Sequence, residues 1–109
     1  MNKKKLQLLA DLNYQYLPGR TVANPAAYLA ASAKRSAAVR RRMACQLDIA
    51  YGDSKGQLLD VFPGIADDSP VHVFIHGGYW RASTVNKGVY SHVAAPLVAA
   101  GACVVLLDY

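Results

Sequence analysis

The sequence predicts an α/β fold, and two features carry that prediction. Apolar residues first follow helical spacing and then, from residue 46, the alternation that is typical of strands. Two strongly apolar segments, 71–75 and 102–107, flank a stretch of helical character. This order predicts a strand–helix–strand unit with parallel strands and a right-handed crossover.

The first part of the chain is predicted to be helical. A short helix is expected over residues 4–13, and Pro18-Gly19 ends it. A second helix is expected to start after Asn24, a good N-cap, and to run to about Met43. One stripe of this helix should pack: Tyr28, Leu29, Ser32, Ser36, Val39 and Met43. Basic residues outside the stripe should face water: Lys34, Arg35, Arg40, Arg41 and Arg42.

The strands are predicted from residue 46 onward. Residues 46–51 and 58–62 flank a turn and predict a β-hairpin. The nearly continuous apolar run at 71–75 suits a strand buried on both faces. A helix is expected between residues 85 and 100, kinked or starting late because of Pro96. Gly101 is predicted to cap it in the left-handed conformation, before a strand at 102–107.

Composition indicates one globular domain. Of 109 residues, 53% are hydrophobic and 17% are charged, and disordered chains show the opposite balance. The net charge of +5 gathers near residues 3–5 and 34–42. No nucleic-acid motif accompanies it, so a solvated basic helix face is the favoured interpretation. No apolar run approaches the roughly 20 residues of a membrane span, and no signal peptide is evident, which favours a cytoplasmic protein.

The segment VHVFIHGGYW, residues 71–80, carries the chemistry. Gly77 and Gly78 come directly after a predicted strand, at the end where open α/β sheets bind ligands. With no Cβ in the way, peptide N–H groups there can point into a crevice and stabilise an oxyanion. A plain Gly-Gly turn is the alternative, but the neighbouring Tyr79 and Trp80 favour a pocket or an interface.

HGGYW at 76–80 resembles the HGGxW motif of arylformamidases, the kynurenine formamidases of the α/β-hydrolase superfamily. The resemblance extends over nearly the whole chain. Tyr51-Gly52 and residues 59–63 are similar to the first hairpin of that family, and 90–107 to its first helix and following strand. Asp108-Tyr109 resembles the start of its next loop, and residues 12–16 are more weakly similar.

The resemblance implies hydrolysis of N-formyl-kynurenine to kynurenine and formate, by a Ser-Asp-His triad without a cofactor. It implies that the backbone N–H groups of Gly77, Gly78 and Tyr79 hold the oxyanion, as in the related loop of lipases and esterases. His76 would brace the loop, and Trp80 would form a wall beside a small acyl amide or ester substrate.

The sequence departs from the family at the nucleophile. No GxSxG pentapeptide occurs, and the acid and histidine follow the serine in this fold, so the whole triad is expected beyond Tyr109. The expected organisation is a helical segment, 1–44, and the first four strands of an incomplete α/β-hydrolase domain, 45–109. The partner is then the remaining C-terminal part of that domain. His92 is expected on a helix surface, outside the triad.

Two further expectations follow. The strand at 71–75 would lack one neighbour, so these 109 residues alone are expected to be poorly stable as a monomer. His72 and His76 stand about 13 Å apart on an extended strand, too far to share a zinc ion, so no metal site is expected.

Three alternatives remain open. A carboxylesterase of the hormone-sensitive-lipase type shares the HGG element, although Trp80 favours the formamidase. A non-catalytic truncated remnant agrees with the missing nucleophile. A small nucleic-acid-binding protein has only the arginines at 40–42 in its favour, so no nucleic-acid or membrane partner is expected. The sequence leaves homo-oligomerisation open.

Overall fold

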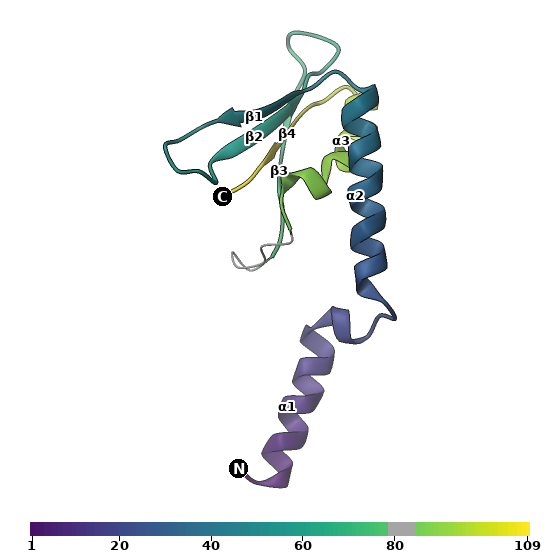
Figure 1. The fold of residues 1–109 in the computed structure, drawn as a ribbon, viewed down its shortest axis with the longest axis vertical. Coiled ribbons are helices and arrows are strands. Elements are labelled where there is room, and N and C mark those ends of the chain that lie inside the picture. Colours follow the sequence, from purple (N-terminus) through teal and green to yellow (C-terminus); the bar gives the residue numbers. More distant parts are fainter. Residues whose placement is uncertain (79–84) are drawn as a thin grey trace.

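A computed structural model describes residues 1–78 and 85–109. Three α-helices are present in this part: α1 (Lys3–Tyr16), α2 (Pro25–Arg42) and α3 (Ala94–Ala99). Three short 3-10 helices accompany them: η1 (Pro18–Arg20), η2 (Lys87–Val89) and η3 (Ser91–Val93). The strands are β1 (Gln46–Ala50), β2 (Leu58–Phe62), β3 (Val71–Ile75) and β4 (Cys103–Leu107) (Figure 1).

The four strands form one mixed sheet in the order β1-β2-β4-β3. β1 and β2 are the predicted antiparallel hairpin, and β3 and β4 are the predicted parallel pair. β2 joins the two units by pairing antiparallel with β4. The predicted α/β class is therefore confirmed for the described residues.

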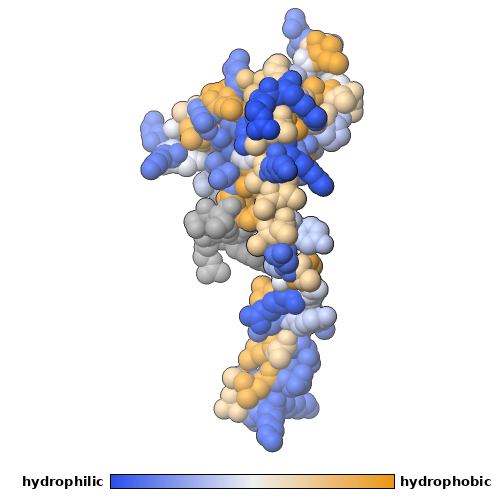
Figure 2. Space-filling view, turned by 45° about the vertical axis from the view of Figure 1, so that its right-hand side comes forward, coloured by the Kyte–Doolittle hydropathy of each residue, from blue (hydrophilic) through white to orange (hydrophobic). Residues whose placement is uncertain are grey.

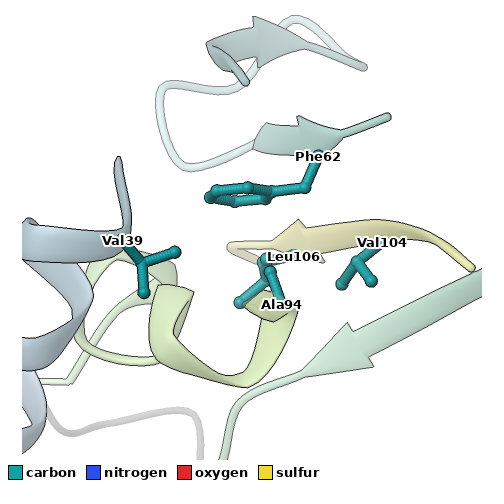
Figure 3. Close-up of a cluster of buried hydrophobic side chains, with 5 residues drawn as sticks. All are labelled: Val39, Phe62, Ala94, Val104 and Leu106. Carbon is teal, nitrogen blue, oxygen red and sulfur yellow. The ribbon is translucent and has the colours of Figure 1, made fainter. Parts of the chain in front are cut away.

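The hydrophobic core lies between the sheet and the helices that cover one of its faces (Figure 3). Phe62 of β2 and Val104 and Leu106 of β4 are fully buried. They meet Val39 from α2 and Ala94 from α3. Alternation along β4 explains this, because every second side chain of a strand points to the same face.

The helix boundaries differ in detail from those predicted. α1 is longer than expected. α2 begins at Pro25 as predicted, but Asn24 does not cap it with its side chain. The reason is its backbone, which is left-handed (φ 52°), whereas a capping residue needs the extended conformation. α3 starts late, with Pro96 in its first turn, and Gly101 ends it at φ 101° as expected.

The predicted packing face of α2 is confirmed except for Tyr28, since its other residues are buried or partly buried: Leu29, Ser32, Ser36, Val39 and Met43. Ser36 and Val39 are buried, whereas Tyr28 is 69% exposed. The prediction that Arg40 faces water is wrong, because its Nη1 donates hydrogen bonds to the Gly88 carbonyl and, at 2.8 Å, to Ser91 Oγ. Arg40 therefore joins α2 to η2 and η3.

α1 extends away from the sheet, and none of its residues is buried (Figure 1). Hydrophobic side chains line its surface beside hydrophilic ones (Figure 2). Leu6, Leu9 and Leu12, which lie on one side of α1, are between 39% and 50% exposed.

The prediction that the strand at 71–75 is buried on both faces is wrong. Val71, Val73 and Ile75 share one face and are 63%, 51% and 63% exposed. β3 stands at the end of the sheet with β4 as its neighbour. Only the opposite face of β3 packs, where Phe74 lies 5.4 Å from the Tyr90 ring, measured between centroids.

We expect the isolated chain to self-associate through β3, because an apolar edge strand templates pairing with another chain. Val73→Lys should reduce this association by placing a charge on the exposed face. Sedimentation velocity over a concentration series measures it, with Ile65→Lys, in an exposed loop, as the control. An unchanged distribution of oligomers in Val73→Lys would contradict the expectation.

Candidate active site

His76 and Asp108 meet at the carboxyl ends of β3 and β4. These strands are parallel and in register, with Ile75 opposite Leu107, so the residues that follow them are neighbours. His76 Nε2 lies 3.0 Å from Asp108 Oδ1. The pair marks the edge of the sheet at which α/β proteins bind ligands.

The His76 side chain is almost fully buried, at 8% exposure. Its Nδ1 lies 2.7 Å from the carbonyl oxygen of Gly77, and its ring stacks on Tyr109 with centroids 4.7 Å apart. The Tyr109 hydroxyl donates to the His76 carbonyl at 2.8 Å. Each ring nitrogen therefore lies within hydrogen-bond distance of an oxygen, Nδ1 of the Gly77 carbonyl and Nε2 of the Asp108 carboxylate.

The imidazole orients the Gly77–Gly78 peptide. C=O and N–H point in opposite directions in a trans peptide, and no cis bond occurs among the described residues. Since the Gly77 carbonyl faces the ring, the Gly78 N–H points away from it. Within residues 1–78 and 85–109, neither Gly77 N–H nor Gly78 N–H donates a hydrogen bond.

Of the two glycines, Gly78 is required by its backbone conformation. Gly78 has φ 133°, a conformation that residues with a Cβ rarely adopt. A Cβ at Gly77 would meet no atom within 4 Å, so the space beside the turn is open among the described residues. Tyr79 and Trp80 lie outside the described residues, so their assigned roles stay predictions.

Sequence reasoning missed a buried ion cluster behind Asp108. The Lys87 backbone N–H donates to Asp108 Oδ1 at 2.7 Å. The Lys87 ammonium lies 2.7 Å from Asp60 Oδ1 and 2.6 Å from Asp48 Oδ1. Lys87 and Asp60 are only 7% and 1% exposed. The position of Asp108, directly after an apolar strand, could have indicated a site residue. No local sequence pattern indicated Lys87.

The charge state of Lys87 follows from these contacts. Burial by itself lowers the pKa of an ammonium. Hydrogen bonds and charges of Asp48 and Asp60 outweigh burial and raise the Lys87 pKa above its ordinary value. The cluster therefore holds a charged lysine among two carboxylates.

The prediction that His92 lies on a helix surface is wrong. Its Nδ1 is 3.0 Å from Ser36 Oγ, and its backbone N–H donates to the same oxygen at 3.0 Å. His92 thus helps to pack η3 against α2, away from the Gly77–Gly78 turn. In the described part of the chain, no cluster of three or more His, Cys, Asp or Glu residues is arranged to hold a metal ion. No helix there is long and apolar enough to cross a membrane.

Fold and site together define an α/β protein with a glycine turn at the edge of the sheet where open α/β proteins bind ligands. A solved structure from Silicibacter sp. TM1040, described as a candidate thioesterase, superimposes with a TM-score of 0.79. It is 27% identical, and the match covers 90% of this chain and 37% of that one. No protein-family model matches the chain.

The more specific likeness is to kynurenine formamidases. The chain is 34% identical to that of Danio rerio over 107 residues, which cover 91% of this chain and 36% of the relative. Kynurenine formamidase of Salmo salar is 35% identical over 65 residues, covering 58% of this chain and 21% of the relative. The chain thus spans about a third of the length of the Danio rerio relative. Formamidases and thioesterases are both hydrolases.

Proposed function

We propose that this chain is the N-terminal part of a serine-type hydrolase of the arylformamidase kind and that it supplies the oxyanion hole. The donors are the backbone N–H groups of Gly77, Gly78 and Tyr79. The observation that carries the proposal is the Gly78 N–H, which points away from the His76 ring and donates to no described residue. The formamidase relatives support the choice of reaction.

The reaction places these groups around one carbonyl of the substrate. A serine from the C-terminal part of the domain attacks the acyl carbon, and the carbonyl oxygen becomes an oxyanion. N–H donors already aimed at that oxygen stabilise it, each by about 3 kcal/mol in the transition state. His76 is not the general base, because Asp108 and the Gly77 carbonyl occupy both of its ring nitrogens. Trp80 would form a wall beside the substrate, and no cofactor takes part.

The substrate proposed is N-formyl-kynurenine, which is hydrolysed to kynurenine and formate in the cytoplasm. The complete protein should cleave it with a kcat/KM well above that for p-nitrophenyl acetate. Absorbance of released kynurenine measures the first reaction and released nitrophenolate the second. Cleavage of the acetate ester alone would contradict the formamidase assignment.

The thioesterase-like neighbour favours a second candidate, an esterase that uses the same oxyanion hole. A panel of acetyl esters and acyl thioesters, assayed beside N-formyl-kynurenine, separates the two. If the complete protein hydrolyses none of these acyl substrates, the result would favour the alternative of a non-catalytic remnant.

A further inference from the structure

A continuous series of contacts links a buried lysine to the Gly77–Gly78 turn. The Lys87 backbone N–H holds Asp108, the Asp108 carboxylate holds the His76 ring, and the ring holds the Gly77 carbonyl. Each contact is 3.0 Å or shorter. The last contact sets the direction of the Gly78 N–H.

Lys87, the first residue of the series, is held in place by the ion pairs of its own side chain. The Lys87 ammonium bridges two carboxylates of the hairpin, Asp60 on β2 and Asp48 on β1. Asp60 Oδ1 also accepts the Asp48 backbone N–H at 2.9 Å, which ties the irregular part of β1 to β2. Charged groups thus tie the start of η2 to the hairpin, while the rest of η2 is held to α2 by the buried Val89 and by hydrogen bonds from Ser36 and Arg40.

The carboxylate of Asp108 depends on this arrangement. Its Oδ1 accepts hydrogen bonds from both the Lys87 N–H and the His76 ring. If η2 shifts, the carboxylate loses one donor and is free to rotate away from the ring. The His76 ring would then lose the partner that holds it toward the Gly77 carbonyl.

From this geometry we infer that Lys87 is a positioning residue for the oxyanion donors, acting through Asp108 and His76. Its ion pairs with Asp60 and Asp48 fix η2, and the orientation of the Gly78 N–H depends on η2. The catalytic meaning of this role rests on the proposed function, whereas the contacts themselves do not.

The direct test uses ring N–H signals of His76 in ¹⁵N-labelled full chain, observed by NMR. Lys87→Met should speed the exchange of the ring N–H protons with solvent by about tenfold, because the ring opens locally. Lys34→Met, which removes an exposed lysine from α2, is the matched control and should leave the exchange unchanged. Unchanged exchange in folded Lys87→Met would overturn the inference.

If Lys87→Met does not fold, a variant that perturbs the cluster less can be used for the same exchange measurement. Asp48→Asn removes one of the two carboxylates, and asparagine tolerates the left-handed backbone at this position (φ 57°). It should speed ring exchange in the same direction but by less. No change in Asp48→Asn, with Lys87→Met unfolded, would equally overturn the inference.

Kinetics of the complete hydrolase separate this inference from the proposed function. Lys87→Met should lower kcat with little change in KM, because the donors act on the transition state. Faster ring exchange with an unchanged kcat would uphold the positioning role and count against the oxyanion hole.

Discussion

Gly78→Ala is expected to lower the kcat of the complete hydrolase by about 10²- to 10³-fold, the typical cost of losing one oxyanion donor. Gly78 has φ 133°, and a side chain at that φ is strained. The turn would relax by rotating its peptides, which moves the Gly78 N–H away from the substrate oxygen. Substrate binding depends less on this donor, so KM should change little.

Gly101→Ala is the matched control for this variant. It also places a Cβ on a residue of positive φ, 101°, but at the C-terminal end of α3. Both variants should lose thermal stability, whereas only Gly78→Ala should lose kcat at temperatures where both are folded. Steady-state assays with active-site titration measure this. Equal losses of kcat in the two variants would show that strain alone explains the effect.

A large loss of stability is expected when the buried ion cluster around Lys87 is broken. Lys87→Met should lower the free energy of unfolding by about 3–5 kcal/mol, because it leaves the Asp60 carboxylate buried without its countercharge. Urea unfolding followed by circular dichroism measures the loss. Asp48→Asn should cost far less, since the Asp48 side chain is 66% exposed and water screens its charge.

A double variant tests the cause of this loss. Lys87→Met combined with Asp60→Leu removes both buried charges and should regain most of the stability lost by Lys87→Met alone. A loss equal to the sum of the two single variants would contradict a buried ion pair.

The pH dependence of the same loss has a definite sign. Because the Lys87 pKa is raised in the folded chain, its contribution is complete below the ordinary value of 10.5. The contribution disappears as the pH rises through the folded-state pKa. The difference in stability between wild type and Lys87→Met should therefore be constant from about pH 7 to 9 and shrink in stronger alkali.

Much of the fold was predictable because its signals are local. Alternation identified β1, apolar runs identified β2, β3 and β4, and Gly101 marked the end of α3. The exposure of β3 was not predicted from its composition, because the burial of a strand's face depends on which elements pack over that face. Arg40 and His92 were misplaced for a similar reason, since their partners lie about 50 residues away in the chain.

The sequence by itself determined the order of strands and helices and the Gly-Gly turn after β3, because backbone preferences act over a few residues. Only the tertiary structure decided which polar groups stand behind that turn. Asp108 reaches His76 through the register of β3 against β4, and Lys87 reaches Asp60 across the sheet. These partners are 32 and 27 residues apart in sequence, and hydrogen bonds over such separations depend on packing that no local pattern encodes.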